Sequence, residues 1–335
     1  MKTRLLLTRT GQELEEAARA AVAALRSGLP VALPTETVYG LAADALRPGA
    51  VAAIFEAKER PFFDPLIVHL PSSGWLGELT AVPAGDAALV ARLAEAFWPG
   101  PLTLVLPRRD GVPDLVTSGL PTVAVRMSAH PVFSTVVEAF GGPLAAPSAN
   151  RFGRISPTRA EHVVEELDGR IPLVIDGGAA RHGVESTIVA VSGGKLSILR
   201  NGPVTREMLS PFAPLAGVGA VERPAAPGQM ESHYAPGTPL RLLAPGEPPL
   251  PRAGLRCGLL GWQRDPGGFE QVEILSRQGD LREGAAALFA ALRRLDAAGL
   301  DCLLAEPVPE TGLGVAIMDR LRKAAAPVAW RKEIL

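Results

Sequence analysis

The feature that most constrains the fold of this chain is a repeated alternation of amphipathic helical segments with short apolar segments. Residues 13–27 carry apolar side chains at three- and four-residue spacing, which predicts a helix that Gly28 ends. The apolar segment 30–34 follows and predicts a strand. Further helices are expected at 50–58 and 86–97, with strands at 66–70, 102–106, 123–125, 144–146, 173–176, 187–191 and 196–199. This order predicts an α/β domain with helices packed on an open twisted sheet.

The alternation resumes after a proline-rich segment. Residues 221–239 contain four prolines and no apolar period, which indicates an extended linker. Beyond it, strands are expected at 240–243, 258–262 and 302–305, with helices at 284–298 and 314–323. This pattern predicts a smaller, Rossmann-like α/β domain with a mostly parallel sheet. We therefore divide the chain into a first domain at 1–215, a linker at 216–239 and a second domain at 240–335.

One helix start is expected from a capping pattern. Thr158 and Glu161 have the spacing of a capping box, in which each side chain bonds the backbone of the other residue. The helix that they open is expected to run to about Leu167.

Composition narrows the class of protein. With 335 residues, 47% of them hydrophobic, the chain can bury a sizeable core, and a net charge of -1 gives no overall attraction to a polyanion. Cys257 and Cys302 lack a CxxC pattern, so buried thiols are expected rather than a zinc site or a disulfide scaffold. No signal peptide and no apolar stretch long enough to span a membrane is present, so we expect a cytoplasmic protein.

The familiar nucleotide and catalytic motifs are missing, so any ligand site must be built from other loops. The sequence has no GxxxxGK[ST], GxGxxG, HExxH or GxSxG pattern. The segment PTETVYGLAADA at 34–45 places Thr35, Glu36 and Thr37 directly after an expected strand. Open α/β sheets bind ligands at the carboxyl ends of their strands. A turn with capping hydroxyls is the alternative.

Cations stand at two further positions. Lys58 and Arg60 end a helix before a proline, where they could pair with phosphates or with the helix dipole. Arg126 interrupts an apolar strand and needs a partner, because an unpaired buried charge is costly. A bound carboxylate and a protein carboxylate are both open as that partner. His69 ends another apolar strand, where a hydrogen-bonded core or edge histidine is the default.

Two later loops complete the set of candidate segments. Residues 143–158, PLAAPSANRFGRISPT, carry Ser148 and Ser156 into an expected helix start, and hydroxyls with backbone amides at such a place suit an anion. The segments GVESTIV and LRNGP place Ser186 at the start of one strand and Arg200 at the end of another.

Together, in this order and spacing, these segments resemble the YrdC-like domain of threonylcarbamoyl-AMP synthases. The motifs that carry the resemblance are PTETVYGL, K-x-R-P with PL-x-V-H, PGPLT, APSAN and G-x-ESTIV, between about residues 14 and 205. PGQMESHYAP resembles the linker of the long, two-domain form of the family, and ETGLGVAIMDRLRKAA resembles the close of its C-terminal domain.

The resemblance implies site residues at matching positions. The threonine pocket falls on Thr37, His69, Arg126, Ala146 and Ser186. The ATP contacts fall on Arg60, Asp64, Thr122, Ser148, Ser156, Arg200 and Tyr234, with Lys58 as a further phosphate-binding candidate. Tyr234 lies in the linker, which the resemblance implies is an active-site lid. Asp64 departs from the usual asparagine, so it either helps hold Mg²⁺ or pairs with a basic neighbour.

The implied activity joins L-threonine, bicarbonate and ATP into threonylcarbamoyl-AMP and pyrophosphate, the first step of a tRNA threonylcarbamoyladenosine modification. This makes the chain a nucleotidyltransferase that uses Mg²⁺ with ATP, and no residue of the chain is assigned as a certain metal ligand. The product is expected to pass to a tRNA threonylcarbamoyl transferase. A weak or transient contact between this protein and tRNA stays open. The protein is expected to be a monomer.

Three rival functions remain at this point. An RNA-binding module would use a concave basic platform, yet only 5% of the residues are aromatic and no stacking array is visible. Carbamoyl transfer, as in hydrogenase-maturation proteins with a similar domain, would call for zinc-finger segments that two cysteines cannot supply. A regulatory protein that keeps the fold without turnover is the third.

Overall fold

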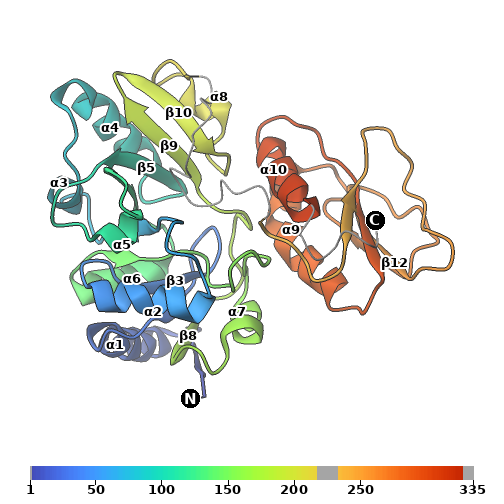
Figure 1. Ribbon diagram of the computed structural model, residues 1–335, viewed down its shortest axis with the longest axis horizontal. Coiled ribbons are helices and arrows are strands. Elements are labelled where there is room, and N and C mark those ends of the chain that lie inside the picture. The colour runs from blue at the N-terminus through green and yellow to red at the C-terminus, as the bar shows by residue number, and fades with distance from the viewer. Residues whose placement is uncertain (1, 217–232, 327–335) are drawn as a thin grey trace. The chain divides into compact units, whose positions relative to one another are not determined.

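The computed structural model describes residues 2–216 and 233–326, which form two compact units (Figure 1). The first unit comprises Met1–Phe152, Pro157–Arg181 and Glu185–Gln229. The second comprises Gly153–Ser156, His182–Val184 and Met230–Leu335. Most of the expected linker and lid, residues 217–232, lies outside the described residues. No helix in the described part of the chain is long and apolar enough to cross a membrane.

Ten strands of the described residues form the sheet of the first unit. Its order is β1-β8-β2-β3-β7-β4-β6-β5-β9-β10. The strands are β1 Arg4–Leu7, β2 Val31–Leu33, β3 Gly40–Asp44, β4 Ile67–His69, β5 Leu102–Pro107, β6 Thr122–Arg126, β7 Leu144–Ala145, β8 Leu173–Asp176, β9 Thr187–Ser192 and β10 Lys195–Arg200. The sheet contains parallel pairs such as β4 with β6 and β5 with β9 as well as antiparallel pairs such as β5 with β6. The sheet is therefore mixed, and the expected open α/β architecture is confirmed.

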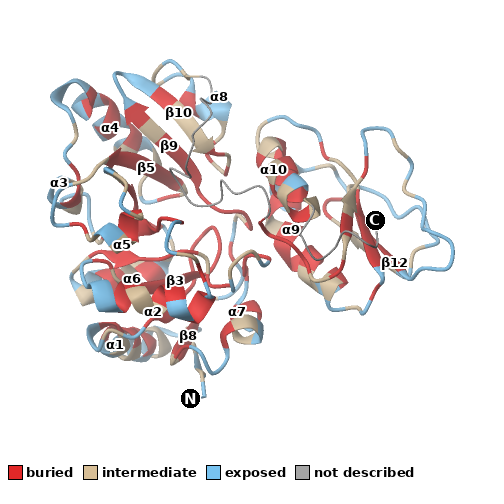
Figure 2. Ribbon diagram, viewed as in Figure 1, coloured by how far each residue is buried: buried red, intermediate tan, exposed pale blue. Residues whose placement is uncertain are grey.

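Helices flank this sheet. They are α1 Gly11–Arg26, α2 Pro48–Lys58, α3 Trp75–Leu79, α4 Ala84–Phe97, α5 Asp114–Thr117, α6 Pro131–Phe140, α7 Ala160–Leu167 and α8 Arg206–Leu209. Because side chains alternate along a strand, Val31 and Leu33 of β2 pack in the cluster that includes α1 and α6, whereas Ala32 packs in the cluster that includes α2 and α4. Burial of both faces explains why central strands such as β2 and β5 are largely apolar. Figure 2 shows β5 mostly in red, the colour of buried residues, whereas the edge strand β10 is partly intermediate and exposed.

Several local expectations differ from the structure. The Thr158–Glu161 capping box is wrong: α7 has Arg159 as its N-cap without a side-chain bond, and the Thr158 N–H donates instead to Nδ1 of His162 at 3.2 Å. A different local contact, four residues along the chain, thus replaces the expected cap. A real capping box opens α1, where Thr10 and Glu13 bond each other's backbone. Strand β3 was not expected, because its residues lie inside the polar motif at 34–45.

The second unit has a parallel sheet of four described strands in the order β11-β14-β12-β13. The strands are β11 Leu240–Leu242, β12 Cys257–Gly261, β13 Gln271–Ile274 and β14 Cys302–Ala305, with helices α9 Leu281–Asp296 and α10 Gly314–Ala325. The expected parallel sheet is confirmed. Cys257 and Cys302 are buried free thiols, as predicted. The structure places them on adjacent strands with their Sγ atoms 3.2 Å apart.

Candidate active site

Three of the predicted threonine-binding residues lie at the carboxyl ends of strands. Thr37 follows β2, while His69 and Arg126 end β4 and β6. The two strands are parallel, and their register places His69 directly opposite Arg126. The fold therefore gathers, at one edge of the sheet, residues that are far apart in the sequence, as expected for a ligand site of an α/β protein.

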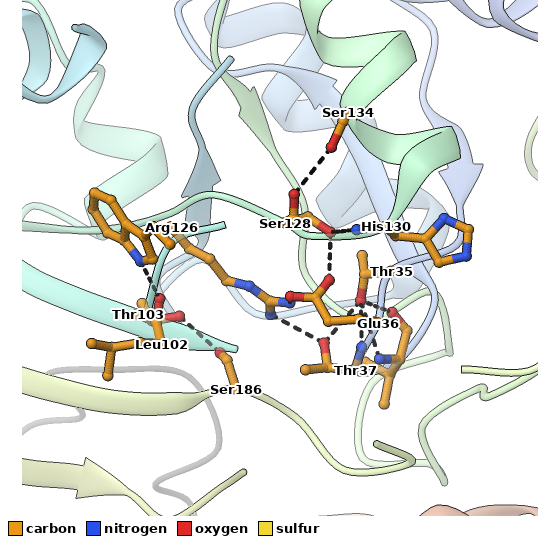
Figure 3. Close-up of polar contacts among 12 residues, drawn as sticks. Thr35, Glu36, Thr37, Leu102, Thr103, Arg126, Ser128, His130, Ser134 and Ser186 are labelled. Carbon is orange, nitrogen blue, oxygen red and sulfur yellow. Dashed lines mark hydrogen bonds and ion pairs between the residues drawn. The ribbon is translucent and has the colours of Figure 1, made fainter. Parts of the chain in front are cut away.

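Arg126 lies at the centre of a buried polar network (Figure 3). Its Nη2 is 2.6 Å from Oε1 of Glu36, and its Nη1 donates to Oγ1 of Thr37 at 3.1 Å. The other carboxylate oxygen of Glu36 accepts a 2.5 Å hydrogen bond from Oγ of Ser128. Burial by itself would raise the pKa of Glu36, but the charge of Arg126 and these hydrogen bonds lower it to about 2. Of the two partners left open by the sequence, the structure supplies the protein carboxylate.

The turn that carries Glu36 is fixed by a threonine. Oγ1 of Thr35 accepts the backbone N–H groups of Thr37 at 3.1 Å and Val38 at 3.2 Å, and lies 2.8 Å from Oγ1 of Thr37. This local bonding is the turn with capping hydroxyls that the sequence offered as an alternative. The turn does not exclude a ligand site, because the same bonds hold Thr37 against Arg126.

Two buried atoms of this cluster have no hydrogen-bond partner among the described residues: Nε of Arg126 and Nδ1 of His69. An unsatisfied buried donor or acceptor costs about 1–3 kcal/mol, so such atoms call for a ligand or another explanation. Burial, helped by the charge of Arg126, lowers the pKa of His69 to about 3, so its ring is neutral at pH 7. The ring lies against Phe133 of α6, with 4.5 Å between centroids.

Ser186 connects the two predicted sets of ligand residues. Its Oγ lies 2.8 Å from Oγ1 of Thr103 and accepts a hydrogen bond of 3.0 Å from Nη2 of Arg200. Nε of Arg200 also donates to the Ser186 carbonyl at 3.0 Å. Ser186 belongs to the predicted threonine pocket and Arg200 to the predicted ATP contacts. The structure thus places the two sets in direct contact.

A carboxylate among cations forms the other part of the site. Oδ2 of Asp64 lies 2.9 Å from Nη2 of Arg60, and both side chains are almost fully buried. Burial raises the pKa of Asp64, an effect opposed by the charges of Arg60, Lys58 and Arg200. The basic neighbour proposed for Asp64 is therefore present. Its Oδ1 accepts no hydrogen bond from the described residues.

Lys58 is buried and turned toward backbone. Its Nζ donates to the carbonyls of Ser148 and Asn150, each at 2.5 Å. Burial lowers the pKa of Lys58 well below its usual value, and the charge of Arg60 adds to this effect. Lys58 therefore fixes the loop that carries Ser148, and its contact with phosphate stays a prediction.

The remaining predicted residues are more scattered. Ala146 donates its N–H to the carbonyl of Ile67, two residues before His69, at 2.9 Å. Thr122 begins β6, four residues before Arg126. Because a strand rises about 3.3 Å per residue, the two residues lie about 13 Å apart, and Thr122 is not part of the Arg126 network. Ser156 and Tyr234 belong to the second unit, where the Tyr234 ring stacks on Phe289 at 5.4 Å between centroids. The described residues contain no group of three His, Cys, Asp or Glu side chains able to hold a metal.

The sequence assigned no individual role to three members of this cluster: Glu36, Thr103 and Ser128. Glu36 and Thr103 stand inside motifs that the sequence did single out, PTETVYGL and PGPLT. Nothing local marks Ser128, whose contact with Glu36 spans 92 positions. A polar residue within a ligand-binding motif is the signal that could have identified the first two.

Fold and site together define a YrdC-like α/β domain with a polar ligand site, followed by a second α/β domain. Residues 23–202 match the model of the Sua5/YciO/YrdC family, described as telomere recombination. Residues 204–326 match the model described as threonylcarbamoyl-AMP synthase, C-terminal domain.

Curated relatives and a solved structure match almost the whole chain. The threonylcarbamoyl-AMP synthase of Bacillus subtilis (strain 168) is 41% identical over 326 residues, covering 91% of this chain and 92% of that protein. The synthase of Pyrococcus abyssi (strain GE5 / Orsay) is 41% identical, covering 92% and 93%. The crystal structure of P. abyssi Sua5 complexed with L-threonine superposes with a TM-score of 0.86 at 38% identity, covering 97% and 98%. The chain therefore belongs to the threonylcarbamoyl-AMP synthase family, in its two-domain form.

Proposed function

We propose that this protein is a nucleotidyltransferase that makes threonylcarbamoyl-AMP from L-threonine, bicarbonate and ATP and releases pyrophosphate. One observation carries the proposal: Ser186, of the predicted threonine pocket, is hydrogen-bonded to Arg200, of the predicted ATP contacts. A reaction between two substrates needs their binding groups side by side, because positioning supplies a large part of the rate enhancement. The solved relative that holds L-threonine supports the identity of the amino acid.

Arg126 binds the threonine carboxylate in this proposal. Its Nε–H is the donor without a partner in the described residues, and carboxylate oxygens are its natural acceptors. Thr37, Ala146 and Ser186 complete the pocket. His69 is neutral, and its Nδ1 accepts or donates a single hydrogen bond to the substrate.

Arg60 and Arg200 face the triphosphate, and Lys58 holds the loop of Ser148 that contacts it. Ser156, Thr122 and Tyr234 contribute the other ATP contacts that the family resemblance implies. We propose that Mg²⁺ enters with ATP, because the described residues offer no cage of their own, while Asp64 has a carboxylate oxygen without a hydrogen-bond donor. The ion neutralises phosphate charge when bound.

The reaction needs no nucleophile from the protein. The threonine amine takes up bicarbonate with loss of water, and an oxygen of the resulting carbamate attacks the α-phosphorus as pyrophosphate leaves. Neither Glu36 nor His69 is a useful base for the ammonium group, because their pKa values of about 2 and about 3 lie far below the amine value near 8. The amine therefore reaches its neutral form by losing a proton to solvent.

The product is a mixed anhydride that water can hydrolyse, so a second enzyme must consume it promptly. We propose that a tRNA threonylcarbamoyl transferase of the cytoplasm receives this product. We further propose that the protein described here acts as a monomer. A weak or transient contact with tRNA stays a prediction.

Pyrophosphate release by the purified protein tests the proposal. With ATP and Mg²⁺, release is expected to require both threonine and bicarbonate and to be much slower with serine. The Arg126→Ala variant serves as control and is expected to lose threonine-dependent release. No release from the wild-type protein under any combination, together with salt-sensitive tRNA binding, would favour the RNA-binding alternative.

A further inference from the structure

Glu36 is bound to Arg126, yet its place in the molecule does not depend on Arg126 alone. Oε2 accepts the hydroxyl of Ser128, whose Oγ in turn accepts the backbone N–H of His130 at 3.2 Å. The Ser128 carbonyl accepts the hydroxyl of Ser134 at 3.1 Å. Figure 3 shows this chain of contacts running from Glu36 toward α6. Glu36 is therefore anchored to the start of a helix.

The anchored carboxylate decides which donors of Arg126 remain for a ligand. The guanidinium has five N–H groups. One N–H of Nη2 bonds Glu36 and one N–H of Nη1 bonds Thr37, while Nε is the nitrogen without a partner in the described residues. Because the guanidinium is planar and rigid, bonds to two of its nitrogens fix the direction in which the third one points.

We propose that Glu36, held by Ser128, is the positioning residue that orients Arg126 for the carboxylate of L-threonine. This inference rests on the function proposed above. Glu36 stays in place when the substrate enters, so the substrate adds to the network and does not displace it. The lowered pKa of Glu36 agrees with this role, because the carboxylate remains charged over the whole physiological range.

The alternative is that Glu36 competes with the substrate for Arg126. The two roles predict opposite changes in threonine affinity when the negative charge of Glu36 is removed. In Glu36→Gln the side chain keeps its size but loses the charge-assisted bond that orients the guanidinium. A positioning role then weakens threonine binding, whereas a competing role strengthens it.

The experiment measures L-threonine binding by calorimetry and pyrophosphate release kinetics for the full-length wild-type protein, Glu36→Gln and Ser128→Ala. For Glu36→Gln we expect the threonine Kd and KM to rise about 10- to 100-fold, the loss of one charged hydrogen bond. Ser128→Ala is expected to raise both by a smaller factor of about 3 to 10. The KM for ATP should stay within about twofold, because the carboxylate of Glu36 is bonded to Arg126 and Ser128, neither of which is a predicted ATP contact.

Asp86→Asn is the matched control. Asp86 is another buried carboxylate, and within the described part of the chain it accepts hydrogen bonds from the backbone N–H groups of Gly193 and Gly194. The Asp86→Asn substitution is expected to lower the stability of the protein without changing the KM for threonine. An unchanged or tighter threonine Kd in Glu36→Gln would overturn the inference, as would equal losses for threonine and ATP. If the wild-type protein binds threonine but releases no pyrophosphate, the proposed function is refuted. The threonine Kd of Glu36→Gln then decides the role of Glu36 by itself.

Discussion

Two buried ion pairs make the candidate site sensitive to the substitution of single residues. Arg126 and Glu36 are each less than a tenth exposed, and so are Arg60 and Asp64. Breaking such a pair leaves one charge buried without compensation, which typically costs 3–5 kcal/mol. The site therefore depends on ionisation states that burial and pairing set jointly.

The pH dependence of stability is a prediction at this scale. Glu36 has a folded-state pKa of about 2 against an ordinary value of 4.5, so it contributes about 3 kcal/mol of stability above pH 5. The sign follows from the lowered pKa: the contribution is lost as pH falls from about 5 toward 2. Urea unfolding at pH 7 and pH 3.5 should show the stability difference between wild type and Glu36→Gln shrinking by about 1 kcal/mol. A stability difference between wild type and Glu36→Gln that stays constant or grows at pH 3.5 would contradict the lowered pKa of Glu36.

Loops at strand ends are the elements that carry the site, and one of them depends on a glycine. A Cβ at Gly202 would lie 2.5 Å from the Glu185 carbonyl oxygen and 2.5 Å from the Thr187 nitrogen. These atoms flank Ser186, which contacts Thr103 and Arg200. The close approach of two backbone segments therefore sets the position of the serine.

Gly202→Ala tests the importance of this approach. The methyl group meets backbone that cannot turn aside, so we expect Ser186 to shift and pyrophosphate release to fall by about 10²-fold, the cost of roughly 1 Å of misplacement. Gly77→Ala is the control, because a Cβ there meets nothing within 4 Å. Kinetics of both variants, with thermal unfolding to confirm folding, provide the measurement. Full activity in Gly202→Ala would show that the loop absorbs the strain.

At the scale of the whole molecule, each unit has its own sheet and its own hydrophobic clusters. Leu104 of β5 lies in the main cluster of the first unit, whereas Leu259 of β12 and Leu304 of β14 share a cluster of the second. Separate cores of this kind allow separate unfolding, since the free energy of opening is set by local burial.

Native-state hydrogen exchange of two leucine variants tests that independence. Leu259→Ala removes a fully buried side chain and should lower the protection of β12 and β14 amides by about 2–5 kcal/mol. Protection in β4, β5 and β6 should change by less than about 0.5 kcal/mol. Leu104→Ala is the reciprocal variant and should affect only the first unit. Equal loss in both units after either substitution would show one cooperative unit.

The sequence determined much of this protein because its decisive patterns are local. Apolar periodicity located helices such as α1 and α9 and strands such as β2 and β14, since each element buries a regularly spaced face. The polar motifs at strand ends marked the candidate site, and their order and spacing indicated the family. The same local patterns did not predict β3, because its residues lie within a motif that was interpreted as a ligand-binding loop.

Only the tertiary structure decided how the site residues pair. The contact of Arg126 with Glu36 spans 90 positions, and the contact of Lys58 with Asn150 spans 92. A local pattern can show that a buried cation needs a partner, but several carboxylates and carbonyls satisfy that need equally well. The choice among them depends on which strand ends the sheet topology brings together, and that order is fixed by long-range packing of the strands.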